Sequence, residues 1–279
     1  MGFLANRPRR AYVVAATPRS GSTLLCETLR ATGVAGRPEE PFQRLADTGL
    51  PHQPRDYFRG VDDPSLLDLL PPRRVERPIA AADARTRLES AFAEGTTPNG
   101  VFGTKLMWGY LGDFLAGARL LDPSLAAAPD ADVLRAVLGG GAEVPIVQVL
   151  RRDKVGQAIS LWRAIQTQRW RDEGEPGAAA GGGAREPVYH RAAIAHLRDV
   201  LTAGEESWTA WLAERGIAPL RVVVYEELVP ALEPTIRGLL ADLGIDEEPA
   251  EGFAVPRMRR QSNGTSAEWR ERFVAEEGA

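Results

Sequence analysis

Two adjacent stretches near the N-terminus decide the fold class. Ala11-Tyr12-Val13-Val14-Ala15-Ala16 is a continuous apolar run, which is typical of a strand buried on both faces of a sheet. It is followed by the polar turn Thr17-Pro18-Arg19-Ser20-Gly21-Ser22-Thr23 and by apolar residues at helical spacing over 23–30. A strand, a turn and a helix in this order begin many doubly wound α/β folds.

The rest of the chain continues the alternation of strands and helices. Further strands are predicted at 101–106, 145–150 and 221–225, of which 145–150 is the clearest. Helical patterns occur at 83–94, from Asp153 through Trp162, at 192–213 and at 232–243, with a loosely ended helix within 122–142 and a short one around 66–70. We therefore expect an α/β fold, P-loop-like, with one parallel sheet and helices on both faces.

The chain of 279 residues has the length of one large α/β domain or two small ones. We expect a short tail at 1–10 and a single domain at 11–279. The stretch at about 174–187 is rich in glycine and alanine. Such low-complexity sequence buries little apolar surface, so we interpret it as a mobile loop or lid within the domain.

Composition excludes several classes of protein. The formal net charge of −4 argues against a general nucleic-acid binder, which carries a basic surplus. A single cysteine and three histidines exclude a disulfide framework and argue against a metal site built from these residues. No secretion signal, lipidation motif or apolar stretch of membrane-spanning length is present. We therefore expect a cytoplasmic protein with no membrane span.

The turn at 17–23 has the composition of an anion-binding loop. Backbone N–H groups at the start of a helix attract anions, Gly21 permits close approach, and Arg19 adds a forked cation. Walker A loops require a Lys-Ser/Thr pair that this turn lacks, which argues against an ordinary ATPase or kinase. The alternative is a simple helix N-cap formed by Ser20 or Ser22.

A second candidate phosphate site follows the strand at 145–150. Arg151 and Arg152 stand at its carboxyl end, and Ser160 lies nine and eight residues further on, respectively. An arginine at a strand end and a serine about two helical turns later can face one phosphate at the carboxyl edge of a sheet. The alternative is a solvated helix N-terminus with Asp153 as its cap.

Together the two segments resemble the sulfotransferases that use 3′-phosphoadenylyl sulfate (PAPS). Most of the chain is similar to the Stf0 type, the bacterial trehalose 2-sulfotransferase family. The similar segments are Arg19–Leu25, Leu29–Gly36, Thr97–Val101, Lys105–Trp108, Gln157–Ala158, Ser160, Trp162–Ala164, Gln166–Thr167, Ala193–His196 and Arg260–Gln261.

The resemblance implies how PAPS and its product, adenosine 3′,5′-bisphosphate (PAP), would be bound. The loop Thr17, Pro18, Arg19, Ser20, Gly21, Ser22 and Thr23 would hold the 5′-phosphosulfate. Ser160 with either Arg151 or Arg152 would hold the 3′-phosphate, and Arg260 and Gln261 would belong to a C-terminal loop that contacts the donor. No metal is required.

The resemblance also implies the catalytic groups and the class of acceptor. Glu40 would be the base, and Arg19 and Lys105 would stabilise charge, although Lys105 also fits a surface lysine with an extended stem. The acceptor would be a carbohydrate, trehalose-like, or a carbohydrate-bearing natural product, next to Glu39, Glu40 and Trp108. The family is dimeric, so a homodimer is expected.

The acceptor-side loop departs from the family pattern. In the family it usually reads Pro-Gln-Glu-Phe-Phe-Gln after a glycine and an acidic residue. Here Arg37 replaces the acidic residue and Pro41 replaces an aromatic residue, both beside the expected sugar site.

Two other functions are consistent with a nucleotide-binding α/β fold. One is a P-loop-type kinase or other phosphotransferase, which the missing Walker lysine disfavours. The other is a non-catalytic module that binds adenine nucleotides, which the presence of Glu40, Arg19 and Ser160 disfavours.

Overall fold

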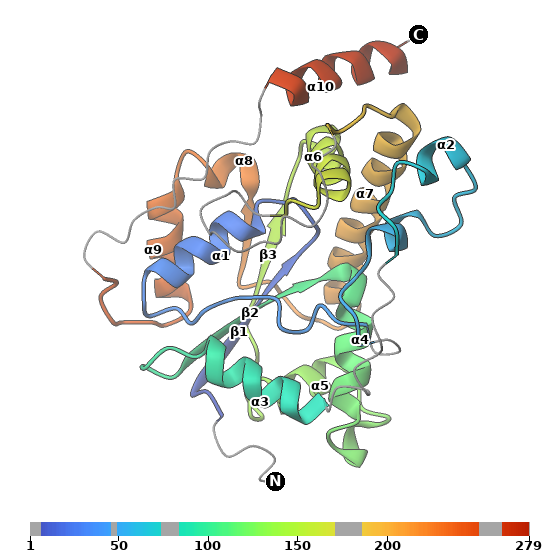
Figure 1. Cartoon of the computed structure of the whole chain (residues 1–279). Coiled ribbons are helices and arrows are strands. Elements are labelled where there is room, and N and C mark those ends of the chain that lie inside the picture. The colour runs from blue at the N-terminus through green and yellow to red at the C-terminus, as the bar shows by residue number, and fades with distance from the viewer. Residues whose placement is uncertain (1–6, 46–48, 74–83, 171–185, 251–263, 279) are drawn as a thin grey trace. The chain divides into compact units, whose positions relative to one another are not determined.

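A computed structural model describes residues 7–45, 49–73, 84–170, 186–250 and 264–278 (Figure 1). Arg260, Gln261 and most of the low-complexity stretch at 174–187 lie outside the described residues. The chain divides into two compact units. The first consists of residues 1–52, 76–152 and 204–256, and the second of residues 53–75, 153–203 and 257–279. The single domain expected from the sequence stays a prediction.

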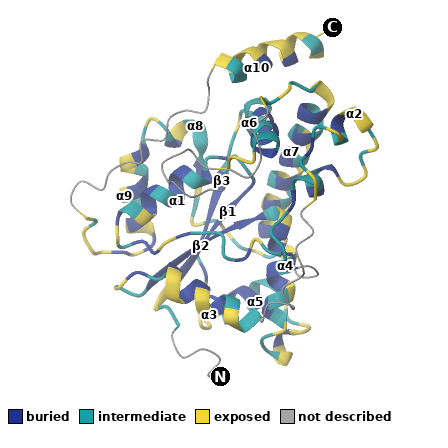
Figure 2. Ribbon diagram, viewed as in Figure 1, coloured by how far each residue is buried: buried dark blue, intermediate teal, exposed yellow. Residues whose placement is uncertain are grey.

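The first unit is built on a four-stranded parallel sheet. Its strands are β1 (Arg10–Ala16), β2 (Val101–Met107), β3 (Ile146–Leu150) and β4 (Arg221–Val224), in the order β2-β1-β3-β4. All residues of β2 are buried, as are residues 11–16 of β1 (Figure 2). This burial explains the unbroken apolar run of β1, whereas β2 also buries the polar side chains of Thr104 and Lys105. The predicted parallel sheet is confirmed.

Helices cover both faces of this sheet, as the sequence predicted. They are α1 (Ser22–Ala31), α3 (Ala84–Gly95), α4 (Trp108–Arg119), α5 (Asp130–Val137), α8 (Tyr225–Leu228) and α9 (Leu232–Asp242), with the 3₁₀ helix η2 (Pro123–Leu125). In Figure 1, α1 and α9 lie on one side of the sheet and α4 and α5 on the other. The carboxyl ends of the parallel strands share one edge, where the loops of the candidate site begin.

The second unit has its own hydrophobic core. Its elements are η1 (Pro54–Phe58), α2 (Pro64–Leu67), α6 (Lys154–Thr167), α10 (Gly264–Glu277) and the first part of α7 (Arg191–Glu214). Trp162 of α6 and Phe273 of α10 are fully buried in this core. Within the described residues, no helix is both long and apolar enough to cross a membrane.

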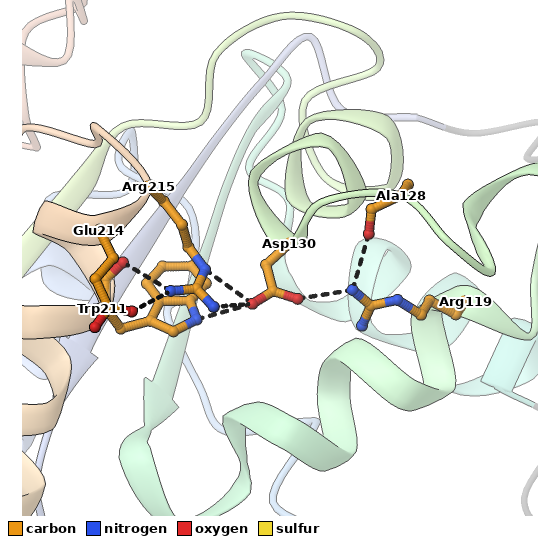
Figure 3. Close-up of polar contacts among 6 residues, drawn as sticks. All are labelled: Arg119, Ala128, Asp130, Trp211, Glu214 and Arg215. Carbon is orange, nitrogen blue, oxygen red and sulfur yellow. Dashed lines mark hydrogen bonds and ion pairs between the residues drawn. The ribbon is translucent and has the colours of Figure 1, made fainter.

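Asp130 links three helices of the first unit through its carboxylate (Figure 3). Arg119 of α4 lies 2.7 Å from one carboxylate oxygen, and Arg215 and Trp211 Nε1 lie 2.7 and 3.0 Å from the other. Burial alone would raise the pKa of Asp130, but the hydrogen bonds from Arg119, Arg215 and Trp211 outweigh it and lower the pKa below its ordinary value. The charged carboxylate therefore stabilises the fold.

Candidate functional site

The loop between β1 and α1 has an unusual backbone. Arg19 and Gly21 both adopt left-handed conformations, with φ of 60° and 90°. A Cβ atom on Gly21 would lie 2.1 Å from Cδ2 of Tyr225, so only glycine fits at this position. Gly21 is itself the N-cap of α1, and no side chain caps the helix. The alternative in which Ser20 or Ser22 is the cap is therefore wrong.

Ser20 carries a buried hydroxyl in this loop. The residue is 0% exposed, and its Oγ has no hydrogen-bond partner among the described residues. Leaving such a group unpaired costs about 1–3 kcal/mol, so native proteins rarely retain one without a reason. An oxyanion at the uncapped start of α1 would supply the missing acceptor. The loop therefore fits the phosphate or sulfate group that the sequence predicted.

Arg151 supports the loop from the end of β3. Its Nη1 donates a hydrogen bond of 2.8 Å to the carbonyl oxygen of Arg19. Its Cζ lies 4.8 Å from the centre of the Tyr225 ring, the same ring that covers Gly21. This side chain and Tyr225, which follows β4, thus brace the left-handed segment from one side.

Arg152 and Ser160 differ from Arg151 in their surroundings. The Arg152 side chain is 65% exposed and donates to Glu227, and its backbone N–H donates to Glu226 Oε2 at 3.1 Å. Ser160 lies in the second turn of α6, in the second unit, and Asp153 caps that helix as the alternative expected. The shared 3′-phosphate site stays a prediction.

Glu40 and Lys105 lie together at the carboxyl end of β2. Lys105 Nζ is 2.7 Å from Glu40 Oε1, and it also donates to Thr23 Oγ1 at 3.4 Å. The Lys105 side chain is only 4% exposed, so the surface-lysine alternative is wrong, whereas Glu40 is 23% exposed. The structure therefore brings a basic and an acidic group next to the first turn of α1.

Glu39 and Glu40 diverge although they are adjacent. Glu39 forms a β-bridge with Thr104, and its carbonyl accepts a hydrogen bond of 2.9 Å from the Lys105 amide. Extended backbone directs successive side chains to opposite sides. Consequently the Glu39 carboxylate faces Arg30, whose Nη1 lies 3.5 Å from Glu39 Oε1, and the Glu39 side chain is 41% exposed. The Glu40 carboxylate faces Lys105 instead.

Trp108 begins α4 directly after β2. Its half-buried ring packs edge-on against Trp208, with 5.7 Å between centroids. Trp208 in turn donates from Nε1 to the carbonyl oxygen of Ala16, the residue before the loop, at 3.0 Å. Trp108 thus has a packing role, and its contact with an acceptor stays a prediction.

A comparison of the sequence with models of protein families identifies the family of this chain. The model of the family described as "Stf0 sulphotransferase" matches residues 11–276. The chain belongs to the Stf0 sulphotransferase family. The match confirms the resemblance seen in the sequence and supports an enzyme over a non-catalytic module, and a sulfotransferase over a kinase.

Curated relatives of this Stf0 protein have matching lengths. It is 42% identical over 275 residues to the trehalose 2-sulfotransferase of Mycobacterium tuberculosis, a match that covers 97% of each chain. It is 40% identical over 263 residues to the trehalose 2-sulfotransferase of Mycolicibacterium smegmatis, covering 94% of each. A solved structure, the sulfotransferase domain from the Synechococcus PCC 7002 olefin synthase, matches over 96% of both chains with a TM-score of 0.40 and 15% identity.

Two tyrosines at the Stf0 site were not predicted from the sequence. Tyr225 belongs to the segment Tyr225-Glu226-Glu227-Leu228, which reads as an exposed helix start. Tyr110 lies in α4, a helix that the sequence analysis did not predict, and its hydroxyl donates to Glu40 Oε2 at 2.9 Å. The available signal was a tyrosine close to a strand end, because Tyr225 directly follows β4 and Tyr110 lies three residues after β2.

Proposed function

We propose that this Stf0 enzyme transfers a sulfuryl group from PAPS to a hydroxyl group of a carbohydrate, trehalose-like, or of a carbohydrate-bearing natural product. The observation that carries the proposal is the pairing of Glu40 with Lys105 beside Thr23 of the anion-binding loop. The names of the two mycobacterial relatives support a carbohydrate acceptor.

The donor would be held by groups at the carboxyl edge of the sheet. The loop Thr17–Thr23, with the Ser20 hydroxyl and the uncapped start of α1, suits the 5′-phosphosulfate. Arg152 with Ser160 suits the 3′-phosphate, because the exposed pair between Arg152 and Glu227 contributes little and can be exchanged for a phosphate. Arg151 is already engaged with the loop. By resemblance to the family, we also propose Arg260 and Gln261 as contacts of the donor.

Sulfuryl transfer joins the acceptor oxygen to sulfur and breaks the bond between sulfur and the bridging oxygen, whose electron pair leaves with PAP. A sugar hydroxyl is a poor nucleophile at neutral pH, so a carboxylate must take its proton as the new bond forms. Glu40 is partly exposed and suits this role. Lys105 and Arg19 would stabilise the negative charge that shifts toward the bridging oxygen. No metal takes part in this scheme.

Two residues on the proposed acceptor side depart from the family pattern. Arg37 is exposed and Pro41 half-buried in the segment that carries Glu40. Because both replace the residue types usual in the family, the acceptors to test are trehalose first and then other carbohydrates and carbohydrate-bearing natural products. A homodimer is also proposed, by resemblance to the family.

Calorimetry and mass spectrometry test the proposal together. In calorimetry, PAP should bind far more tightly than AMP or ATP. In mass spectrometry, incubation of PAPS with trehalose or a panel of glycosides should yield a product that is heavier than the acceptor by the mass of SO₃, about 80 Da. Turnover should persist in EDTA. Preferential binding of ATP, with turnover that requires Mg²⁺, would favour the phosphotransferase instead. Binding of PAP without sulfation of any acceptor would favour the non-catalytic module.

A further inference from the structure

The Glu40 carboxylate is fixed at both oxygens by residues on either side of one strand–helix junction. Lys105 in β2 contacts Oε1 at 2.7 Å, and Tyr110 in the first turn of α4 donates to Oε2 at 2.9 Å. A carboxylate offers about four acceptor positions, so two remain for a substrate proton. The carboxylate is thus oriented without being saturated.

Tyr110 is held more rigidly than the group it contacts. Its ring is buried in the core of the first unit, whereas Glu40 is partly exposed on a loop. The carbonyl oxygen of Lys105 lies 3.4 Å from the Tyr110 hydroxyl, but a phenol has one hydrogen and the shorter contact to Glu40 is the stronger one. The Tyr110 hydroxyl therefore links the hydrophobic core of the first unit to Glu40.

Tyr110 and Lys105 are not equivalent anchors. In the proposed reaction, which this inference presupposes, Lys105 also stabilises charge on the transferring group, so its ammonium is shared between two anions. The Tyr110 hydroxyl has no such second anion in the scheme. It can hold Glu40 while Lys105 changes partners.

We propose that Tyr110 is a positioning residue for sulfuryl transfer, because its hydroxyl holds the Glu40 carboxylate in the orientation needed to accept the acceptor's proton. Small errors in the placement of a base reduce turnover strongly, since proton transfer requires hydrogen-bond reach in the transition state. Binding of the donor does not depend on this contact.

The test is the variant Tyr110→Phe, which keeps the buried ring and removes only the hydroxyl. A hydrogen bond to a charged group changes an equilibrium by about ten- to a hundredfold, so we expect kcat to fall about tenfold. The KM for PAPS and the affinity for PAP should stay within about twofold of the wild type. In a Glu40→Gln background, Tyr110→Phe should produce no further fall in kcat, because the two groups act as a unit.

Tyr189→Phe provides the matched control, because Tyr189 Oη donates to Glu276 Oε2 at 2.7 Å in the second unit. It removes the same kind of bond and should leave kcat unchanged. The proposal is overturned if Tyr110→Phe retains wild-type kcat, if its effect persists in the Glu40→Gln background, or if the fall matches a loss of folded protein in circular dichroism. Failure of the proposed function has a different result, because the wild type itself would then sulfate no acceptor. Failure of the Tyr110 proposal alone leaves the wild type active.

Discussion

Arg151 and Tyr225 form a stacked pair behind the anion-binding loop, with 4.8 Å between the guanidinium carbon and the centre of the ring. Gly21 packs against the ring of Tyr225, and its position leaves no room for a side chain there. The left-handed backbone at Arg19 and Gly21 is therefore supported by residues from the ends of β3 and β4. Strain in such a segment persists only where its surroundings enforce it.

Gly21→Ala should disrupt this loop. A left-handed conformation costs a residue with a Cβ about 1–2 kcal/mol, and the contact with Tyr225 adds an overpacking cost of about 1–3 kcal/mol. We expect a lower melting temperature and a large loss of PAP affinity in calorimetry. Gly33→Ala is the matched control, because Gly33 also has positive φ, 73°, but open space around it. Equal loss of PAP affinity in both variants would contradict the role of the Tyr225 contact.

Arg152→Ala and Arg151→Ala should differ in ligand selectivity. If Arg152 binds the 3′-phosphate, its loss weakens PAP by about ten- to a hundredfold and leaves AMP nearly unchanged. Ser160→Ala should behave in the same way. Arg151→Ala should weaken both ligands alike, because Arg151 supports the loop that the two ligands share. Calorimetric titration of PAP and AMP into each variant measures this, and a reversed pattern would exchange the roles of the arginines.

Glu40→Gln should abolish most turnover and preserve donor binding. Loss of a positioned base typically lowers the rate by about 10²–10⁴-fold. The amide oxygen of glutamine can still accept a bond from Lys105, which limits the effect on folding. Glu39→Gln is the control, because the Glu39 side chain faces Arg30 instead. Steady-state kinetics at saturating PAPS measures both, and a larger loss in Glu39→Gln would move the base by one residue.

Asp130→Asn should destabilise the fold in a pH-dependent way. Burial opposes the charge, but bonds from Arg119, Arg215 and Trp211 lower the pKa of Asp130 in the folded state. Its contribution is therefore present above the unfolded pKa of about 3.9 and lost as pH falls through the lower folded pKa. At pH 7 we expect a loss of about 2 kcal/mol, or roughly 5 °C in melting temperature. The difference from wild type should shrink below about pH 4, and a constant difference would contradict the assignment.

The sequence predicted the sheet well because nearly all residues of β1, β2 and β3 are buried. β1 reads as an unbroken apolar run from Ala11 to Ala16, and only Gln148 interrupts the apolar run of β3. Helix α4 was missed because Gly109 and Gly112 lower its helix propensity. Packing of its apolar face against the core overrides that preference, and this packing is a tertiary effect.

The geometry of the candidate site could be predicted from the sequence only where its residues are neighbours along the chain. The loop at 17–23 lies within one turn, whereas Glu40 and Lys105 are separated by 65 residues. The β-bridge between Glu39 and Thr104 brings them together, and no spacing rule reveals it. Tyr110 could not be foreseen for the same reason, since its partner comes from a distant loop.

The hydrogen bond between the Lys105 amide and the Glu39 carbonyl also has a practical consequence for engineering. It ties the main chain next to Glu40 to the buried strand β2, and this anchors the start of the loop that carries the carboxylate. A randomised library confined to residues 41–45 would therefore vary the segment proposed to face the acceptor while the proposed base, Glu40, stays in register. Selection for activity on new glycosides can then begin from a protein in which the main chain beside Glu40 is already held by β2.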